Sequence, residues 1–160
     1  MKKIILFLVG VFLLTNSCSR DDNSSGSETS IVGKWQLSHT VLNGTVTYNG
    51  AVANVKDFKV NATDCQKKSY MLFKNDGTGN EEAWLENEGS CQLKESGAYT
   101  YSYNSSTREI TETYNGVSVK VALKSLTSSE LAYSQAINKL DTGNGVFTGT
   151  GDVYFVKVSN

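Results

Sequence analysis

Alternation of apolar and polar residues with a period of two is the feature that most restricts how this chain can fold. The strictest example is residues 98–103, where Tyr99, Tyr101 and Tyr103 alternate with small or hydroxyl side chains. Such a period places one face of a β-strand on the core and the other in solvent. The 160 residues contain no proline, so Gly, Asn and Asp must make the turns between strands. We therefore expect an all-β protein.

About eight strands are expected, joined mostly by hairpins. Asn75-Asp76-Gly77 and Asn115-Gly116 are typical of tight hairpin turns. The expected strands cover residues 34–41, 69–74, 78–85, 98–103, 109–114, 117–123, 129–137 and 151–158. Successive hairpins favour a small antiparallel up-and-down β-barrel, and a two-sheet sandwich is the alternative with the same strand count.

Residues 45–64 are the least regular stretch of the chain. Asn43-Gly44 is expected to end the first strand, and Asn49-Gly50 can form a small hairpin. A long irregular segment in a compact domain usually has a functional role. We therefore interpret residues 45–64 as a lid over the barrel.

The N-terminal residues indicate export. Lys2 and Lys3 precede an apolar run from Ile4 to Leu14, which is typical of a secretory signal peptide covering residues 1–17. The segment that ends in Cys18 resembles the lipobox of bacterial lipoproteins, which implies that the Cys18 thiol is acylated. The expected partner of the chain is then the membrane, reached through an N-terminal lipid.

The residues after Cys18 are consistent with a lipid anchor. Ser19-Arg20-Asp21-Asp22 resembles the acidic export signal of surface lipoproteins in Bacteroidetes-type bacteria. The expected location is therefore the cell envelope, with the lipid in the outer membrane and the domain able to face the cell surface. Residues 18–30 are typical of a flexible tether, and residues 31–160 form the expected barrel domain.

Two alternatives to a lipid anchor stay open. The first is secretion without lipid. The second is a transmembrane anchor, which is disfavoured because the apolar run falls short of the roughly 20 residues that span a bilayer.

The charge balance argues against nucleic acid as a partner. The chain has 15 Lys and Arg against 16 Asp and Glu, and it loses Lys2 and Lys3 with the signal peptide. The mature domain is therefore weakly acidic, and only Arg20 and Arg108 offer a guanidinium group to phosphate. A protein partner cannot be named from these residues.

Two cysteines remain once Cys18 is assigned to the lipid. In an oxidising compartment Cys65 and Cys91 indicate one disulfide, and two buried free thiols are the alternative. A metal site is not expected, because neither cysteine belongs to a Cys-x-x-Cys pair or has a histidine nearby.

Several short motifs together resemble one known family. Ile31-Val32-Gly33-Lys34-Trp35 contains the G-x-W signature of a lipocalin first strand. Cys65 and the segment Met71–Thr78 resemble the family pattern C…L-x-F-x-x-D-G-T, and Cys91 falls where a second family cysteine is expected. The chain thus resembles the lipocalin-like lipoprotein domains of Bacteroidetes-type bacteria. The resemblance implies a small antiparallel barrel closed at one end by Trp35, with no family catalytic residues to transfer.

Candidate ligand-binding residues lie on the strands expected to line the barrel. His39 shares the parity of Trp35 and Leu37 and could donate to a ligand, although a core or rim histidine with a structural partner is the alternative. The tyrosine row could stack a flat ligand, although ordinary packing in the barrel wall is the favoured explanation. The predicted ligand-binding set is Trp35, Leu37, His39, Tyr99, Tyr101 and Tyr103.

Metal and catalytic chemistry find little support in the sequence. Asp76, Glu81 and Glu82 surround one hairpin and could bind calcium, but their spacing differs from a calcium loop and a solvated acidic turn is the alternative. A single histidine without a nucleophile motif does not make a hydrolytic triad. We expect no enzyme activity, no metal and no cofactor.

The favoured hypothesis is a lipid-anchored barrel that binds a small, largely apolar molecule in its interior. Barrels of about eight strands can hold one such ligand. The alternative is a cell-surface structural or protein-interaction module with a packed core and no ligand. The absence of a convergent set of polar residues in the sequence is the observation that favours this alternative.

Overall fold

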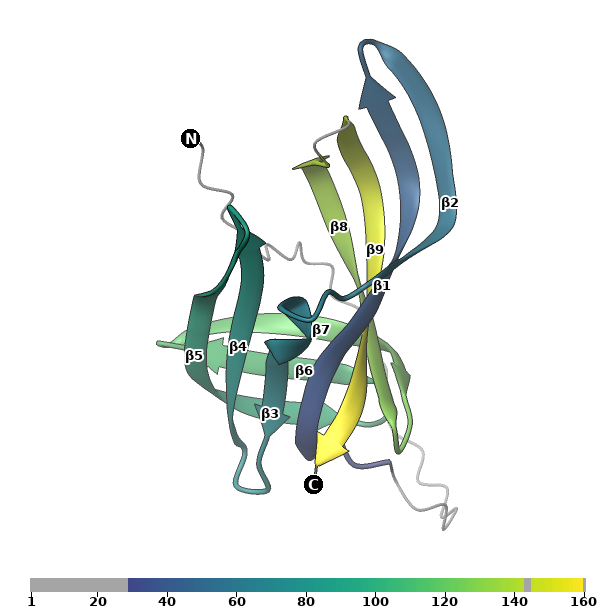
Figure 1. Ribbon diagram of the computed structural model, residues 1–160. Helices are drawn as coiled ribbons and strands as arrows, with labels where there is room; N and C mark the ends of the chain where they lie inside the picture. The colour runs from purple at the N-terminus through teal and green to yellow at the C-terminus, as the bar shows by residue number, and fades with distance from the viewer. Residues whose placement is uncertain (1–28, 143–144, 160) are drawn as a thin grey trace.

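The computed structural model describes residues 29–142 and 145–159 (Figure 1). Its strands are β1 (Gly33–Tyr48), β2 (Ala51–Asn61), β3 (Tyr70–Phe73), β4 (Thr78–Asn87), β5 (Ser90–Asn104), β6 (Glu109–Tyr114), β7 (Val117–Leu126), β8 (Glu130–Asp141) and β9 (Val146–Ser159). A short 3-10 turn, η1 (Gln66–Lys68), precedes β3. Over this part of the chain, no helix has the length and apolar character needed to cross a membrane. The predicted signal peptide, Cys18 and most of the tether lie outside the described residues.

Eight of the nine strands close into an antiparallel barrel, which confirms the predicted fold class. Neighbours follow chain order from β3 to β9, and β1 pairs with both ends of that series. It contacts β3 over Gly33–Gln36 and β9 over Lys34–Thr47. The ninth strand, β2, pairs only with the second half of β1 and lies at the edge of the sheet.

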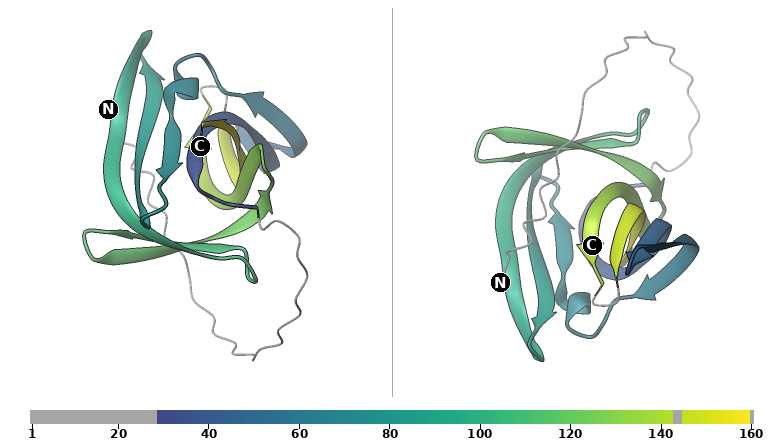
Figure 2. Two further views of the ribbon diagram at one scale, coloured as in Figure 1. Left: turned by 90° about the horizontal axis from the view of Figure 1, so that it is seen from below. Right: turned by 90° about the horizontal axis from the view of Figure 1, so that it is seen from above.

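The barrel is closed in one half and opens in the other. β7 pairs with β8 only over the segment from Leu123 to Leu126. Beyond this segment the two strands diverge, and we call this line of divergence the β7–β8 seam. Figures 1 and 2 show the far ends of β8, β9, β1 and β2 turning away from the layer formed by β4 to β7.

Aromatic and aliphatic side chains fill the closed half. The largest fully buried members of this cluster are Trp35, Phe73, Ile110 and Leu131. Successive side chains along a strand point to opposite faces of the sheet, and these four lie at positions that point inward. The partly buried residues packed against the cluster are Leu37, Tyr101, Tyr103, Tyr114, Leu126 and Tyr133.

The prediction of a lid at residues 45–64 is wrong. β1 continues through Gly44 to Tyr48, turns at Asn49-Gly50 with positive φ at both residues, and returns as β2. The hairpin itself was predicted, but its strands were not. The prediction failed because Asn43-Gly44 is typical of a turn at a strand end, whereas here Gly44 lies within a paired strand.

Gly44 is needed where β1 and β9 come closest. It pairs with Gly149, and a Cβ at Gly44 would lie 2.2 Å from the Thr148 carbonyl oxygen and 2.7 Å from the Gly149 Cα. A Cβ at Gly149 would lie 2.2 Å from the Asn43 carbonyl oxygen. Only glycine fits at both positions, because the atoms in the way belong to the backbone.

The predicted disulfide is confirmed. Cys65 and Cys91 are bonded, with their Cα atoms 5.4 Å apart and a separation of 26 positions in the sequence. Cys65 caps η1, and Cys91 lies near the start of β5. The bond therefore joins the connection between β2 and β3 to the β4–β5 hairpin, on the side of the barrel away from the β7–β8 seam.

Candidate ligand-binding site

Trp35 and Leu37 lie in the closed half, where the core leaves little room for a ligand. Trp35 is 0% exposed, and its indole N–H donates to the Ile31 carbonyl oxygen at 2.6 Å. Leu37 packs against the same cluster from the next inward position of β1. Both residues are placed as the sequence predicted, facing inward from the first strand.

His39 faces the other side of the sheet, so the inward parity predicted for it is wrong. Leu37 pairs with Phe155, but His39 pairs with Tyr154, because the register shifts between Leu37 and His39. A β-bulge of this kind reverses the facing of every later residue on a strand. The imidazole stacks on the Tyr154 ring, with 4.4 Å between ring centroids.

Its surroundings give His39 a structural partner. Its Nδ1 lies 3.2 Å from the Ser38 hydroxyl. Burial, followed by the charge of Lys59, lowers the pKa of the His39 imidazole. Of the two sequence interpretations, the rim histidine with a structural partner matches this geometry.

The hydroxyl groups of the tyrosine row bind backbone. Tyr99 donates to the Leu72 carbonyl oxygen at 3.1 Å, and Tyr101 donates to the Lys74 carbonyl oxygen at 2.7 Å. The Tyr99 ring occupies the space above Gly79, where a Cβ would lie 2.4 Å from the ring. These two tyrosines therefore fix the β3–β4 hairpin against β5, which supports the packing interpretation for them.

Tyr103 borders an open depression of about 600 Å³ beside the β5–β6 and β7–β8 turns. Arg108, Lys124, Ser125 and Leu126 line the same depression. It therefore lies away from the phenols of Tyr99 and Tyr101. The six predicted residues do not converge on one cavity.

The acidic residues around the β3–β4 hairpin separate in the structure. Asp76 accepts hydrogen bonds from the backbone N–H and the hydroxyl of Thr78 at 2.9 and 2.6 Å. Glu82 accepts from the Tyr70 hydroxyl and the Trp84 indole at 3.2 and 2.9 Å. Glu81 faces the barrel interior instead. The described carboxylates at this hairpin thus have separate partners.

A buried glutamate lies inside the barrel, and the sequence analysis did not single it out. Glu112 on β6 is 5% exposed and pairs with the inward Tyr101 of β5. Its Oε2 accepts a 3.3 Å hydrogen bond from the Tyr114 hydroxyl. Tyr114 also forms a hydrogen bond with Glu81 on β4, so a single phenol connects the two carboxyl groups.

Burial dominates the electrostatics of this Glu112–Glu81–Tyr114 cluster. Desolvation, followed by the charge of Glu81, raises the pKa of Glu112 to about 7. The pKa of Glu81 is also raised, by desolvation and then by Glu95. Burial and the Glu112 charge together raise the pKa of the Tyr133 phenol on β8. A carboxyl group here changes charge near neutral pH.

One sequence signal could have identified Glu112. Within residues 109–114, Ile110, Glu112 and Tyr114 alternate, so Glu112 is expected on the same face as a core isoleucine. A charged residue at an inward position is rarely buried without a specific reason. The prediction for residues 109–114 covered the strand and did not extend to the face on which Glu112 lies.

A depression of about 410 Å³ opens at the β7–β8 seam, and its Val121 lies two residues after Val119, which pairs with Glu112. Its apolar lining comes from Val121 and Leu123 of β7 and the Tyr133 ring of β8. Tyr133 belongs to both the depression and the surroundings of Glu112. It lines the depression, and the charge of Glu112 helps to raise the pKa of its phenol.

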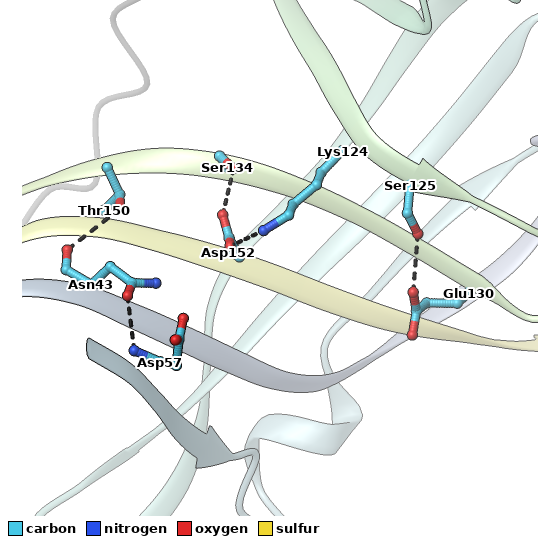
Figure 3. Close-up of polar contacts among 8 residues, drawn as sticks. All are labelled: Asn43, Asp57, Lys124, Ser125, Glu130, Ser134, Thr150 and Asp152. Carbon is cyan, nitrogen blue, oxygen red and sulfur yellow. Dashed lines mark hydrogen bonds and ion pairs between the residues drawn. The ribbon is translucent and has the colours of Figure 1, made fainter. Parts of the chain in front are cut away.

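The polar residues around the depression are paired. Figure 3 shows Asp152 of β9 binding both Lys124 of β7 and Ser134 of β8. The Lys124 bond, followed by the Ser134 bond, lowers the pKa of Asp152. Lys120 forms an ion pair with Glu109 at 2.9 Å. The two lysines at the rim thus have carboxylate partners, and Asp152 holds three strands together where the seam begins.

The protein is a small antiparallel β-barrel. Its first strand carries a buried tryptophan, and a depression lies at its β7–β8 seam. The chain belongs to the lipocalin-like domain family, because the sequence profile of that family matches residues 31–133. Members of the family are generally binding proteins rather than enzymes. No relative is found among curated proteins.

Solved structures of bovine odorant-binding protein are similar to this chain. The complex with undecanal is 12% identical, covers 86% of this chain and 77% of the bovine chain, and has a TM-score of 0.37. The protein from bovine nasal mucosa is 14% identical, with the same coverage and a TM-score of 0.36. At these values the similarity adds nothing to the barrel topology described above.

Proposed function

We propose that the protein is an exported, lipid-anchored lipocalin-like protein of the cell envelope that binds a small, largely apolar molecule. The ligand lies at the β7–β8 depression, against Val121, Leu123 and Tyr133. The single observation that carries the proposal is this depression of about 410 Å³, which is lined in part by apolar inward side chains of β7 and β8. Membership of the lipocalin-like family supports a binding function.

This ligand position differs from the one predicted from the sequence, in which the ligand lies in the barrel interior between Trp35 and the tyrosine row. The closed half is occupied by Trp35 and Phe73, both 0% exposed. Protein interiors leave few voids larger than a water molecule, so a ligand fits beside this core rather than within it.

Native mass spectrometry of the full-length protein from its own host tests the proposal. We expect an additional mass of a small apolar molecule on the wild-type protein. Ala122→Trp should remove it, because Ala122 is exposed and lines the depression, so a large side chain there blocks the opening without overpacking the core. Val117→Trp, an exposed position on the same strand, is the matched control. A bare wild-type protein would contradict the proposal.

A second candidate function is a protein-interaction module. It is favoured by β2, which is an uncovered edge of the sheet and exposes Val52, Phe58 and Val60. Exposed apolar edge strands tend to pair with other chains. Cross-linking in the host would then recover a protein partner that Phe58→Asp abolishes, and the same native spectra would show no small-molecule mass.

A further inference from the structure

One buried oxygen of the barrel interior lacks a hydrogen-bond partner. Among the described residues, Glu112 Oε1 is the buried side-chain atom that has none, whereas Oε2 accepts from Tyr114. A buried acceptor without a partner costs free energy, and a charged acceptor costs more than a neutral one. Such an atom in a native fold calls for an explanation, and a bound donor would supply one.

The side chains that act on Glu112 supply no positive charge. The charged group with the largest effect on its pKa is another carboxylate, Glu81. β7 contributes only Val119 and Val121 to the inward face beside it. The other titratable groups facing this region are Tyr99, Tyr101, Tyr114 and Tyr133. The barrel interior at this point therefore contains two carboxyl groups and several phenols, and Glu112 Oε1 has no hydrogen-bond donor among them.

We propose that the Glu112 carboxylate binds the protonated amine of a small ligand whose apolar part lies in the β7–β8 depression. The ammonium group donates to Oε1, and the phenol rings of Tyr114 and Tyr133 offer the π faces that favour organic cations. The inference rests on the proposed function, since it names the chemical class of the ligand for the same site. The Glu112 carboxylate would then be the charged group that recognises the ligand, beside the apolar lining of the depression.

Other donors fit the site less well. A metal ion needs several ligating groups, and the described part of the chain has no group of three or more His, Cys, Asp or Glu residues that could hold one. A neutral hydroxyl could also donate to Oε1, but a charge-assisted hydrogen bond is roughly twice as strong as a neutral one. The rim lysines do not oppose a cation, because Lys120 and Lys124 are held by carboxylates.

Three probes with the same aromatic body separate these possibilities: 2-phenylethylamine, 2-phenylethanol and phenylacetate. Binding to the full-length protein is measured by isothermal titration calorimetry at pH 8 in a mild detergent, with empty micelles subtracted. We expect the amine to bind about ten to a hundred times more tightly than the alcohol, and phenylacetate to bind most weakly. At pH 5 the preference for the amine should shrink, because Glu112 then carries a proton.

Glu112→Gln keeps the shape of the side chain and removes its charge. This variant should bind the amine no better than the alcohol, while the affinity for the alcohol stays unchanged. Glu86→Gln is the matched control, because Glu86 is an exposed carboxylate on β4 and its loss changes the net charge equally.

The outcomes distinguish this inference from the proposed function. Equal affinity of the wild-type protein for amine and alcohol would overturn the inference and leave an apolar binding site. A preference for the amine that persists in Glu112→Gln would also overturn it, because another group would then be responsible. Failure of all three probes to bind would overturn both proposals.

Discussion

Glu112 is the residue whose environment differs most from that of an ordinary surface glutamate. It is 5% exposed, and burial raises its pKa to about 7 from a usual value of 4.5. The folded protein therefore binds this proton more tightly than the unfolded chain does. The resulting stabilisation is complete below about pH 4.5 and is lost as the pH rises through 7.

We predict that Glu112→Gln weakens the pH dependence of stability. Between pH 5 and pH 8 the wild-type protein should lose up to about 3 kcal/mol of unfolding free energy through Glu112, and the variant should not. The lowered pKa of His39 acts in the opposite direction, because the unfolded chain gains that proton first. The comparison of variant and wild type removes this contribution, which both share.

Urea denaturation at the two pH values provides the measurement. Glu86→Gln again serves as the control and should follow the wild-type protein. Parallel pH profiles for wild type and Glu112→Gln would show that the glutamate titrates normally in the folded state.

At the residue scale, the face on which a side chain lies was predictable wherever the strand has no bulge. Trp35 and the tyrosines face inward as their alternation predicted. His39 does not, because one bulge separates it from Leu37. A bulge depends on the geometry of the partner strand β9, which the residues around His39 do not encode.

At the scale of elements, the strands are longer than their sequences suggest. β5 begins at Ser90 rather than near Ala98, because Glu88 and Gly89 form a tight turn with positive φ at both residues. The polar residues from 90 to 97 lie outside the strands predicted from the sequence. They form strand because pairing with β4 supplies their backbone hydrogen bonds, whatever their own propensity.

We predict that removing the disulfide destabilises the barrel on one side. Cys65→Ser with Cys91→Ser should lower the unfolding free energy by roughly 3–4 kcal/mol, the value that the chain-entropy model gives for a loop of this length. Urea denaturation of the double variant measures the loss, and the reduced wild-type protein is the control. An unchanged midpoint would mean that β3 and β4 hold this side without the bond.

At the scale of the whole molecule, two different interactions hold the barrel together on opposite sides. The disulfide connects η1 to β5, and on the opposite side Asp152 links β7, β8 and β9. The closed topology was predictable from hairpin order and the family motifs. The divergence of the two halves was not, because it arises from strand twist and bulges summed over the sheet.

The lipid anchor at Cys18 remains a prediction. We expect Cys18→Ala to move the protein from the membrane fraction of its host into the soluble envelope fraction, because the acyl chains would have no attachment site. Ser19→Ala keeps the thiol and should fractionate like the wild-type protein. Membrane association that survives Cys18→Ala would argue for secretion by another route or a different anchor.

The contact between Gly44 and Gly149 limits how this protein can change over time. Each position is closed to larger residues by main-chain atoms of the opposite strand, so no alteration of a neighbouring side chain can make room. A mutation at one site is therefore not rescued by a mutation at the other. Glycine should therefore be retained at both positions as the rest of the sequence changes. The two glycines can then serve as reference positions when distant descendants of the chain are aligned.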